Sequence, residues 1–172
     1  MMQSTALKRG LAALAVAVTV AGTPAASFAA CATPKESAAL EARVLLSELM
    51  VAALSCNQRP SYNAVVTRYQ GEMAGTGKAL KGYFSRVHGA RSSQELNGFV
   101  TRMANEASRR SLREFTQFCS AAEGKFAALM DERQPHSFER FASLQPEASS
   151  HGVEVCQYTA SNAPADTAAR TR

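Results

Sequence analysis

Apolar residues recur at helical spacing over residues 34–56, which predicts a first helix. Thr33-Pro34-Lys35-Glu36 marks its start, because Thr can cap a helix, Pro fits the first helical position and Glu can reach back to the cap. Pro60 cannot continue the helix, which should end near Cys56-Asn57. The apolar arc is wide, so we expect a central helix that is buried on most sides. The arc comprises Leu40, Val44, Leu45, Leu46, Leu49, Met50, Ala53 and Leu54.

The second helix is predicted from about Ser61 to His88. Its apolar positions alternate between spacings of four and three, which is the coiled-coil period. Gly89 follows where a C-terminal glycine cap belongs. The seam consists of Tyr62, Val66, Tyr69, Met73, Thr76, Leu80, Tyr83 and Val87.

A third helical segment opens at a second capping box, Ser92-Ser93-Gln94-Glu95. The pattern favours one long helix over about 93–131, and the alternative is a break at Ser108–Ser111. A short helix is predicted over Ser137–Leu144, after Pro135. The polar ladder of the third segment, which we expect to face solvent, is Asn97, Thr101 and Asn105. Its apolar stripe is Leu96, Val100, Met103, Ala107, Ser111, Phe115, Phe118, Ala122, Phe126 and Leu129.

These elements predict an all-α fold, an antiparallel helical bundle with three or four main helices stapled by two disulfides. Cys31 and Cys56 flank the first helix, roughly 35 Å apart at the helical rise, so they cannot pair with each other. Cys119 lies roughly 39 Å along the third helix, near the height of Cys56. This geometry favours Cys56–Cys119 and leaves Cys31 to pair with Cys156.

The N-terminal residues 1–29 have the pattern of a cleaved signal peptide. Lys8-Arg9 form a basic region, Leu11–Val20 an apolar one, and Ser27-Phe28-Ala29 fits the small-x-small rule for cleavage. The alternatives are a retained membrane anchor and a lipid anchor on Cys31. With a signal peptide, the protein would be periplasmic or secreted, and no transmembrane helix is expected in the mature chain.

The remaining chain is predicted to hold one helical bundle domain over residues 30–145. Residues 146–172 are predicted to form a mostly disordered tail that is tethered through Cys156, because the end of the chain is rich in Ala, Thr, Ser and Pro. Four cysteines in an exported chain indicate disulfides. The mature part carries 17 basic and 14 acidic residues once Lys8-Arg9 are removed, so it is only mildly basic.

No catalytic or cofactor motif stands out, so no catalytic residue, cofactor or metal site is predicted. The three histidines, His88, His136 and His151, have no His or Cys at metal-ligand spacing. Glu41 and Glu48 share one face of the first helix, and two surface glutamates are favoured over an acid–base pair.

Basic residues gather over residues 78–113, which hold eight Lys and Arg against two Glu. Such a region can meet an anionic envelope component or an acidic partner. The second helix also carries a stripe of small residues opposite its seam, with basic side chains beside it. A kink or break at Gly75-Thr76-Gly77 is favoured over a contact surface. The possible contact surface comprises Gly71, Gly75, Ala79 and Gly82, with Arg68, Lys78 and Arg86 as its basic border.

Three short stretches, Met50–Cys56, Tyr62–Val66 and Leu96–Thr101, resemble those of an uncharacterised family of small exported bacterial proteins. The resemblance covers roughly residues 40–120 and implies no activity. The export signal, the stapled bundle and the lack of a catalytic cluster predict a non-enzymatic periplasmic protein that binds a protein partner or an anionic envelope component, and not nucleic acid. The alternative is a small-ligand or cofactor carrier that uses the core of the bundle.

Overall fold

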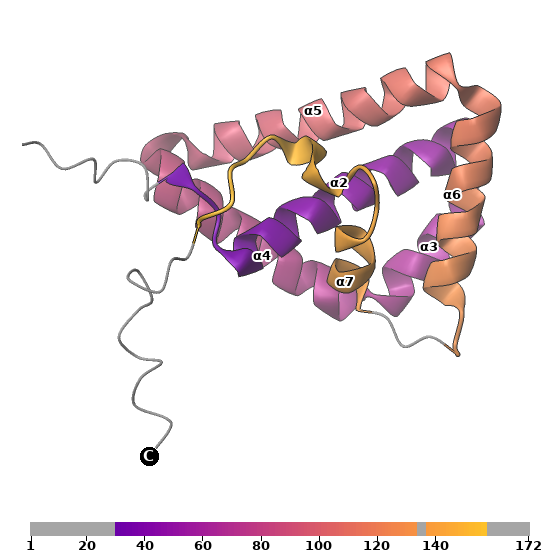
Figure 1. Cartoon of the computed structure of the whole chain (residues 1–172), viewed down its shortest axis with the longest axis horizontal. Coiled ribbons are helices and arrows are strands. Elements are labelled where there is room, and N and C mark those ends of the chain that lie inside the picture. Colours follow the sequence, from indigo (N-terminus) through magenta and orange to yellow (C-terminus); the bar gives the residue numbers. More distant parts are fainter. Residues whose placement is uncertain (1–29, 134–136, 158–172) are drawn as a thin grey trace, which may run out of the picture.

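The computed structural model describes residues 30–133 and 137–157, which fold into a helical bundle. The predicted all-α fold with two disulfides is confirmed. Figure 1 shows α2 running through the middle of the molecule, with α5 along one side and α6 along the next. The elements are α2 (Pro34–Ser55), α3 (Arg59–Arg68), α4 (Gln70–His88), α5 (Ser92–Arg113), α6 (Phe115–Met130) and α7 (Phe138–Ser143), with the short 3-10 helices η1 (Gly89–Arg91) and η2 (Ala148–His151).

Helix α2 is the central element, as its wide apolar arc predicted. The side chain of Thr33 accepts a hydrogen bond from the backbone of Glu36, and the Glu36 carboxylate accepts one from the backbone of Thr33, so the predicted capping box is present. Leu40 and Leu49 are fully buried, on opposite ends of the helix. Two apolar clusters form around α2: Leu40 packs with residues of α4 and α5, and Leu49 with residues of α3, α6 and α7.

The predicted second helix is divided at Tyr69, into α3 and α4. Tyr69 is buried, and its hydroxyl donates a hydrogen bond of 2.8 Å to the Leu129 carbonyl of α6. The interruption coincides with this tertiary contact, whereas α4 continues without interruption through Gly75–Gly77. The break predicted at the glycines is therefore wrong. The predicted end is confirmed, since α4 stops at His88 and Gly89 has a positive φ of 53°.

The segment predicted as one long helix consists of α5 and α6, which meet at Glu114. Glu114 has φ −135° and ψ 50°, and Figure 1 shows the two helices forming a corner there. The favoured long helix is thus wrong, and the break lies beyond Ser108–Ser111, where the alternative placed it. Because the corner rotates the apolar stripe, Phe115 is 55% exposed, and the stripe resumes at the buried Phe118. The capping box expected at Ser92 is absent, because η1 leads directly into α5.

Both predicted disulfides are present, Cys56–Cys119 and Cys31–Cys156. The straight third helix assumed for the first pairing is wrong, because the chain turns at Glu114. Cys119 lies one turn after the α5–α6 corner, close to the C-terminal end of α2, so the corner itself brings it to Cys56. The pairing holds because α5 alone already spans most of the length of α2.

The C-terminal segment packs on the bundle farther than the predicted boundary at residue 145. Helix α7 begins at the predicted place, with the Ser137 side chain as its cap. Beyond it, η2 packs against α2, and His151 is buried. Ala32 and Val155 form a parallel bridge beside the Cys31–Cys156 disulfide, so packed structure continues to Cys156. The predicted signal peptide (1–29) and the last part of the predicted tail (158–172) lie outside the described residues.

Candidate functional site

The stripe of small residues on α4 lies on an open surface. Gly71, Gly75 and Gly82 are exposed, and a Cβ atom added to any of them would meet nothing within 4 Å. Ala79 is half-buried and packs against the apolar cluster that contains Leu80. No described element approaches the glycines closely, so within the bundle they are not a packing surface.

Two of the three basic residues beside the stripe are engaged by the fold. Arg68 donates a hydrogen bond of 3.3 Å to the Met130 carbonyl, and Arg86 forms an ion pair with Glu36. Lys78 is exposed. Arg68 and Arg86 thus have partners within the fold, and the contact surface along the stripe stays a prediction.

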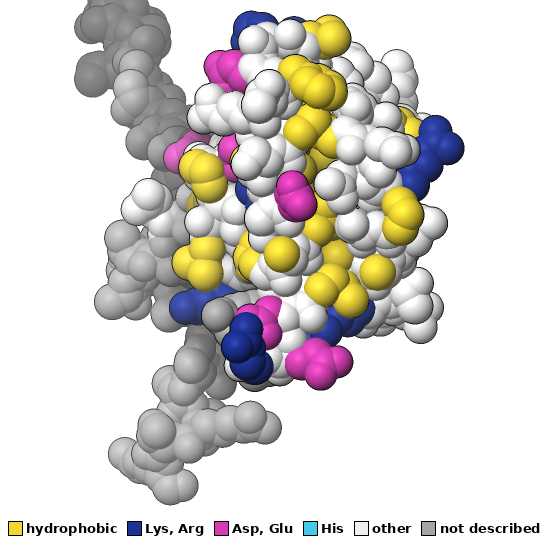
Figure 2. Space-filling model, turned by 90° about the vertical axis from the view of Figure 1, so that its right-hand side faces the viewer, with side chains coloured by type: hydrophobic (Ala, Val, Ile, Leu, Met, Phe, Trp, Pro, Cys, Tyr) yellow, Lys and Arg dark blue, Asp and Glu magenta, His cyan; other side chains and the backbone are white. Residues whose placement is uncertain are grey.

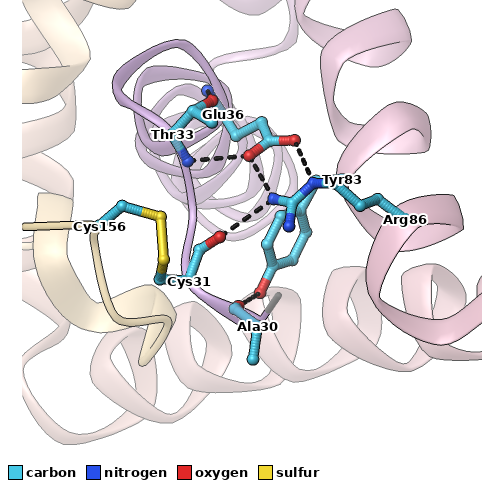
Figure 3. Close-up of polar contacts among 7 residues, drawn as sticks. All are labelled: Ala30, Cys31, Thr33, Glu36, Tyr83, Arg86 and Cys156. Carbon is cyan, nitrogen blue, oxygen red and sulfur yellow. Dashed lines mark hydrogen bonds and ion pairs between the residues drawn. A yellow bond between two sulfur atoms is a disulfide. The ribbon is translucent and has the colours of Figure 1, made fainter. Parts of the chain in front are cut away.

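Arg86 holds the beginning of the described chain, as Figure 3 shows. Its Nη2 atom lies 2.6 Å from Glu36 Oε2 and 3.0 Å from the Cys31 carbonyl oxygen, and the hydroxyl of Tyr83 donates to the Ala30 carbonyl at 3.1 Å. Burial raises the pKa of Glu36, but the hydrogen bonds from Arg86 and Thr33 outweigh it and hold the pKa below its usual value. Arg86 is thus a structural residue.

A buried charge cluster joins four elements of the fold. Glu48 of α2 is 3% exposed, and its two carboxylate oxygens accept hydrogen bonds from Lys125 Nζ of α6 (2.6 Å) and Arg110 Nη2 of α5 (2.9 Å). Lys125 Nζ also lies 3.2 Å from Glu147, just before η2. A buried charge needs such partners, because its transfer out of water costs several kcal/mol.

The expectation of a surface glutamate at position 48 is therefore wrong. The sequence held a signal that would have found it: Glu48 lies inside the apolar arc, beside Leu45 and Leu49. A carboxylate at the centre of an apolar helix face predicts a buried partner of opposite charge. Glu41, on the same face, accepts a hydrogen bond from Ser37 and belongs to no carboxylate pair with Glu48 in the described hydrogen bonds.

The cluster lies beside an open cavity of about 440 Å³ between α5 and η2, here called the arginine cavity. Three arginines line it. Arg110 is fixed by Glu48, Arg109 is paired with Glu106, and the Arg102 guanidinium lies 5.9 Å from the Phe99 ring centroid. Its lining residues are Arg102, Met103, Asn105, Glu106, Arg109, Arg110, Ser150 and His151. Three arginines and only one acidic residue, Glu106, line the cavity, which favours an anionic occupant.

His151 forms the buried wall of the arginine cavity. Its Nδ1 atom accepts a hydrogen bond of 3.0 Å from the Val153 backbone. Burial lowers the pKa of His151, and the negative charge of Glu41 only partly opposes that effect. Because Nδ1 accepts this hydrogen bond, the neutral form of the ring carries its proton on Nε2.

Apolar side chains are exposed around the corner between α5 and α6. Leu112 and Phe115, on either side of Glu114, are 84% and 55% exposed, and Leu54 at the end of α2 is 62% exposed. Figure 2 shows the α6 side of the molecule, where apolar side chains are scattered over the face; most charged side chains lie toward its edges, and one acidic side chain lies near its centre. The corner thus has an apolar character that the basic face of α5 lacks.

Other site types find no support in the part of the chain that the structure describes. No three His, Cys, Asp or Glu side chains there are grouped so that they could hold a metal ion. In the same residues, no helix has the length and apolar character to cross a membrane.

Comparisons with known proteins give no relative for this chain: no family model, no curated protein and no solved structure matches it. The resemblance of residues 40–120 to small exported bacterial proteins stays a prediction.

Proposed function

We propose that this protein is a non-enzymatic, extracytoplasmic binding protein whose arginine cavity holds a phosphate-bearing component of the cell envelope. The two disulfides support the compartment, because such bonds persist in oxidising surroundings. In the same proposal, the N-terminal pattern of residues 1–29 makes that compartment the periplasm. The observation that carries the proposal is the convergence of Arg102, Arg109 and Arg110 on one open cavity.

The arginine cavity suits a phosphate group for two reasons. The guanidinium groups of Arg109 and Arg110 are held by Glu106 and Glu48, so less side-chain freedom is lost when an anion binds. Arg102 makes no ion pair with the described residues and has its donors available for the anion. A planar guanidinium can donate two parallel hydrogen bonds to one phosphate.

The test measures binding of the oxidised protein to vesicles that contain phosphatidylglycerol, to vesicles of phosphatidylcholine alone, and to free glycerol phosphate. We expect Arg102→Gln to weaken binding about tenfold, as one lost charge-assisted contact does. Lys78→Gln is the matched control, because it removes one exposed charge that does not line the cavity.

The arms of the experiment separate the sources of the phosphate. Binding to phosphatidylglycerol vesicles alone indicates a lipid headgroup, and binding to glycerol phosphate as well indicates a soluble or polymeric phosphate. Equal losses for Arg102→Gln and Lys78→Gln would show that only overall charge matters and would overturn the site. Absence of binding in every arm would overturn the proposed function.

A further inference from the structure

A second cavity, of about 370 Å³, opens between the end of α4 and the start of α5 and shares no lining residue with the arginine cavity. We name it the hairpin cavity, because the two helices that form it are joined by the tight turn at Gly89–Arg91. It is lined by Lys81, Phe84, Ser85, Ser92, Ser93, Leu96 and Asn97. Its volume falls in the lower part of the range of ligand pockets, roughly 300–1,000 Å³.

The apolar floor of the hairpin cavity is held in place by the core. The ring of Phe84 lies 5.5 Å from the ring of Phe99 and 5.6 Å from the ring of His88, measured between centroids. Phe84 is only 4% exposed, and Leu96 beside it is half-buried against the same apolar cluster. A floor fixed by ring contacts is preformed, so an apolar ligand segment meets little cost of rearrangement there.

The polar side chains on the rim of the hairpin cavity make no polar interactions with other described side chains. None of its five polar side chains has a hydrogen-bond or ion-pair partner among the described residues. This distinguishes it from the arginine cavity, where Arg109 and Arg110 are both paired. The only charge on the rim is the ammonium group of Lys81, which three hydroxyls and one amide accompany; the five are Lys81, Ser85, Ser92, Ser93 and Asn97.

We infer that the hairpin cavity binds a small amphipathic monocarboxylate. The carboxylate pairs with the Lys81 ammonium and accepts hydrogen bonds from serine hydroxyls, and a short apolar chain lies on Phe84 and Leu96. One positive charge suits one carboxylate, and the small apolar floor suits a short chain. Because the two cavities have no residue in common, this inference does not depend on the proposed function.

Isothermal titration of the oxidised protein with octanoate tests the inference, with octanol as a neutral probe of similar length. We expect saturable binding of octanoate, at least about tenfold tighter than that of octanol, because octanol lacks the charge that meets Lys81. Lys81→Met should remove that difference while it retains the apolar stem of the side chain. Lys78→Met, one turn earlier on α4 and outside the cavity, is the matched control.

Two further variants make the result specific to the cavity. Asn97→Trp places a large ring at an exposed position of the rim and should abolish binding of both probes. Arg102→Gln should leave octanoate binding unchanged, which separates this site from the arginine cavity. Unchanged octanoate affinity in Lys81→Met or in Asn97→Trp, or no saturable binding to the wild-type protein, would overturn the inference.

Discussion

Replacement of Lys125 by Met tests whether the buried charge cluster holds the four elements together. Removal of the sole partner of a buried charge costs about 3–5 kcal/mol. Glu48 retains Arg110 at 2.9 Å in this variant, and Met fills most of the space of the lysine stem. We therefore expect the free energy of unfolding to fall by less, about 2–3 kcal/mol, which corresponds to one unsatisfied buried acceptor on Glu48.

Urea denaturation of the oxidised protein, followed by far-ultraviolet circular dichroism, gives the free energy of unfolding for Lys125→Met, Glu48→Gln and the double variant. The double variant should lose less than the sum of the two single losses, by about 1–3 kcal/mol, because the two side chains contact each other at 2.6 Å. Lys78→Met is the surface control and should change stability by no more than about 0.5 kcal/mol. Additive losses, or a Lys125→Met variant as stable as this control, would refute the role assigned to the cluster.

Three further predictions concern the glycines, the disulfides and pH. Gly75→Ala should stabilise α4 by up to about 1 kcal/mol, because its added Cβ meets open space on a helix. Gly89→Ala should instead destabilise the protein by about 1–2 kcal/mol, because Gly89 has a positive φ. Thermal melts of both variants measure the difference. Loss of Cys56–Cys119 in a Cys56→Ala, Cys119→Ala variant should cost on the order of 4 kcal/mol, since the bridge closes a loop of 63 residues, and denaturant titration measures it against the wild type. A decrease in the free energy of unfolding of less than about 0.5 kcal/mol would contradict that account. His151 has a lowered pKa in the folded state, so as pH falls the unfolded chain takes up this proton first, and stability should decrease below about pH 6.5. His151→Gln should flatten this pH dependence between about pH 5 and 6.5. Below about pH 5 the lowered pKa values of Glu36 and Glu147 also contribute.

Local signals in the sequence determined the fold class and several helix ends, although the capping box expected at Ser92 did not form. The capping box at Thr33, the glycine at 89 and the Ser137 cap act through neighbours a few residues away, so their effects can be read from the chain alone. The pairing of Cys56 with Cys119 followed from helix lengths, and it survived the error about the third helix because the corner still brings Cys119 to the end of α2.

Tertiary structure alone decided where the long helices are interrupted and which polar residues are buried. The interruption at Tyr69 accompanies the contact of its hydroxyl with Leu129, sixty positions away, and the corner at Glu114 turns Phe115 outward although it fits the apolar stripe. Likewise, the partners of Glu48 come from α5 and α6, at sequence separations of 62 and 77 residues. Helical periodicity shows which face of a segment is apolar, but not which distant side chain contacts that face. Both cavities depend on how distant segments come together: η2 and α5 line the arginine cavity, and α4 and α5 line the hairpin cavity.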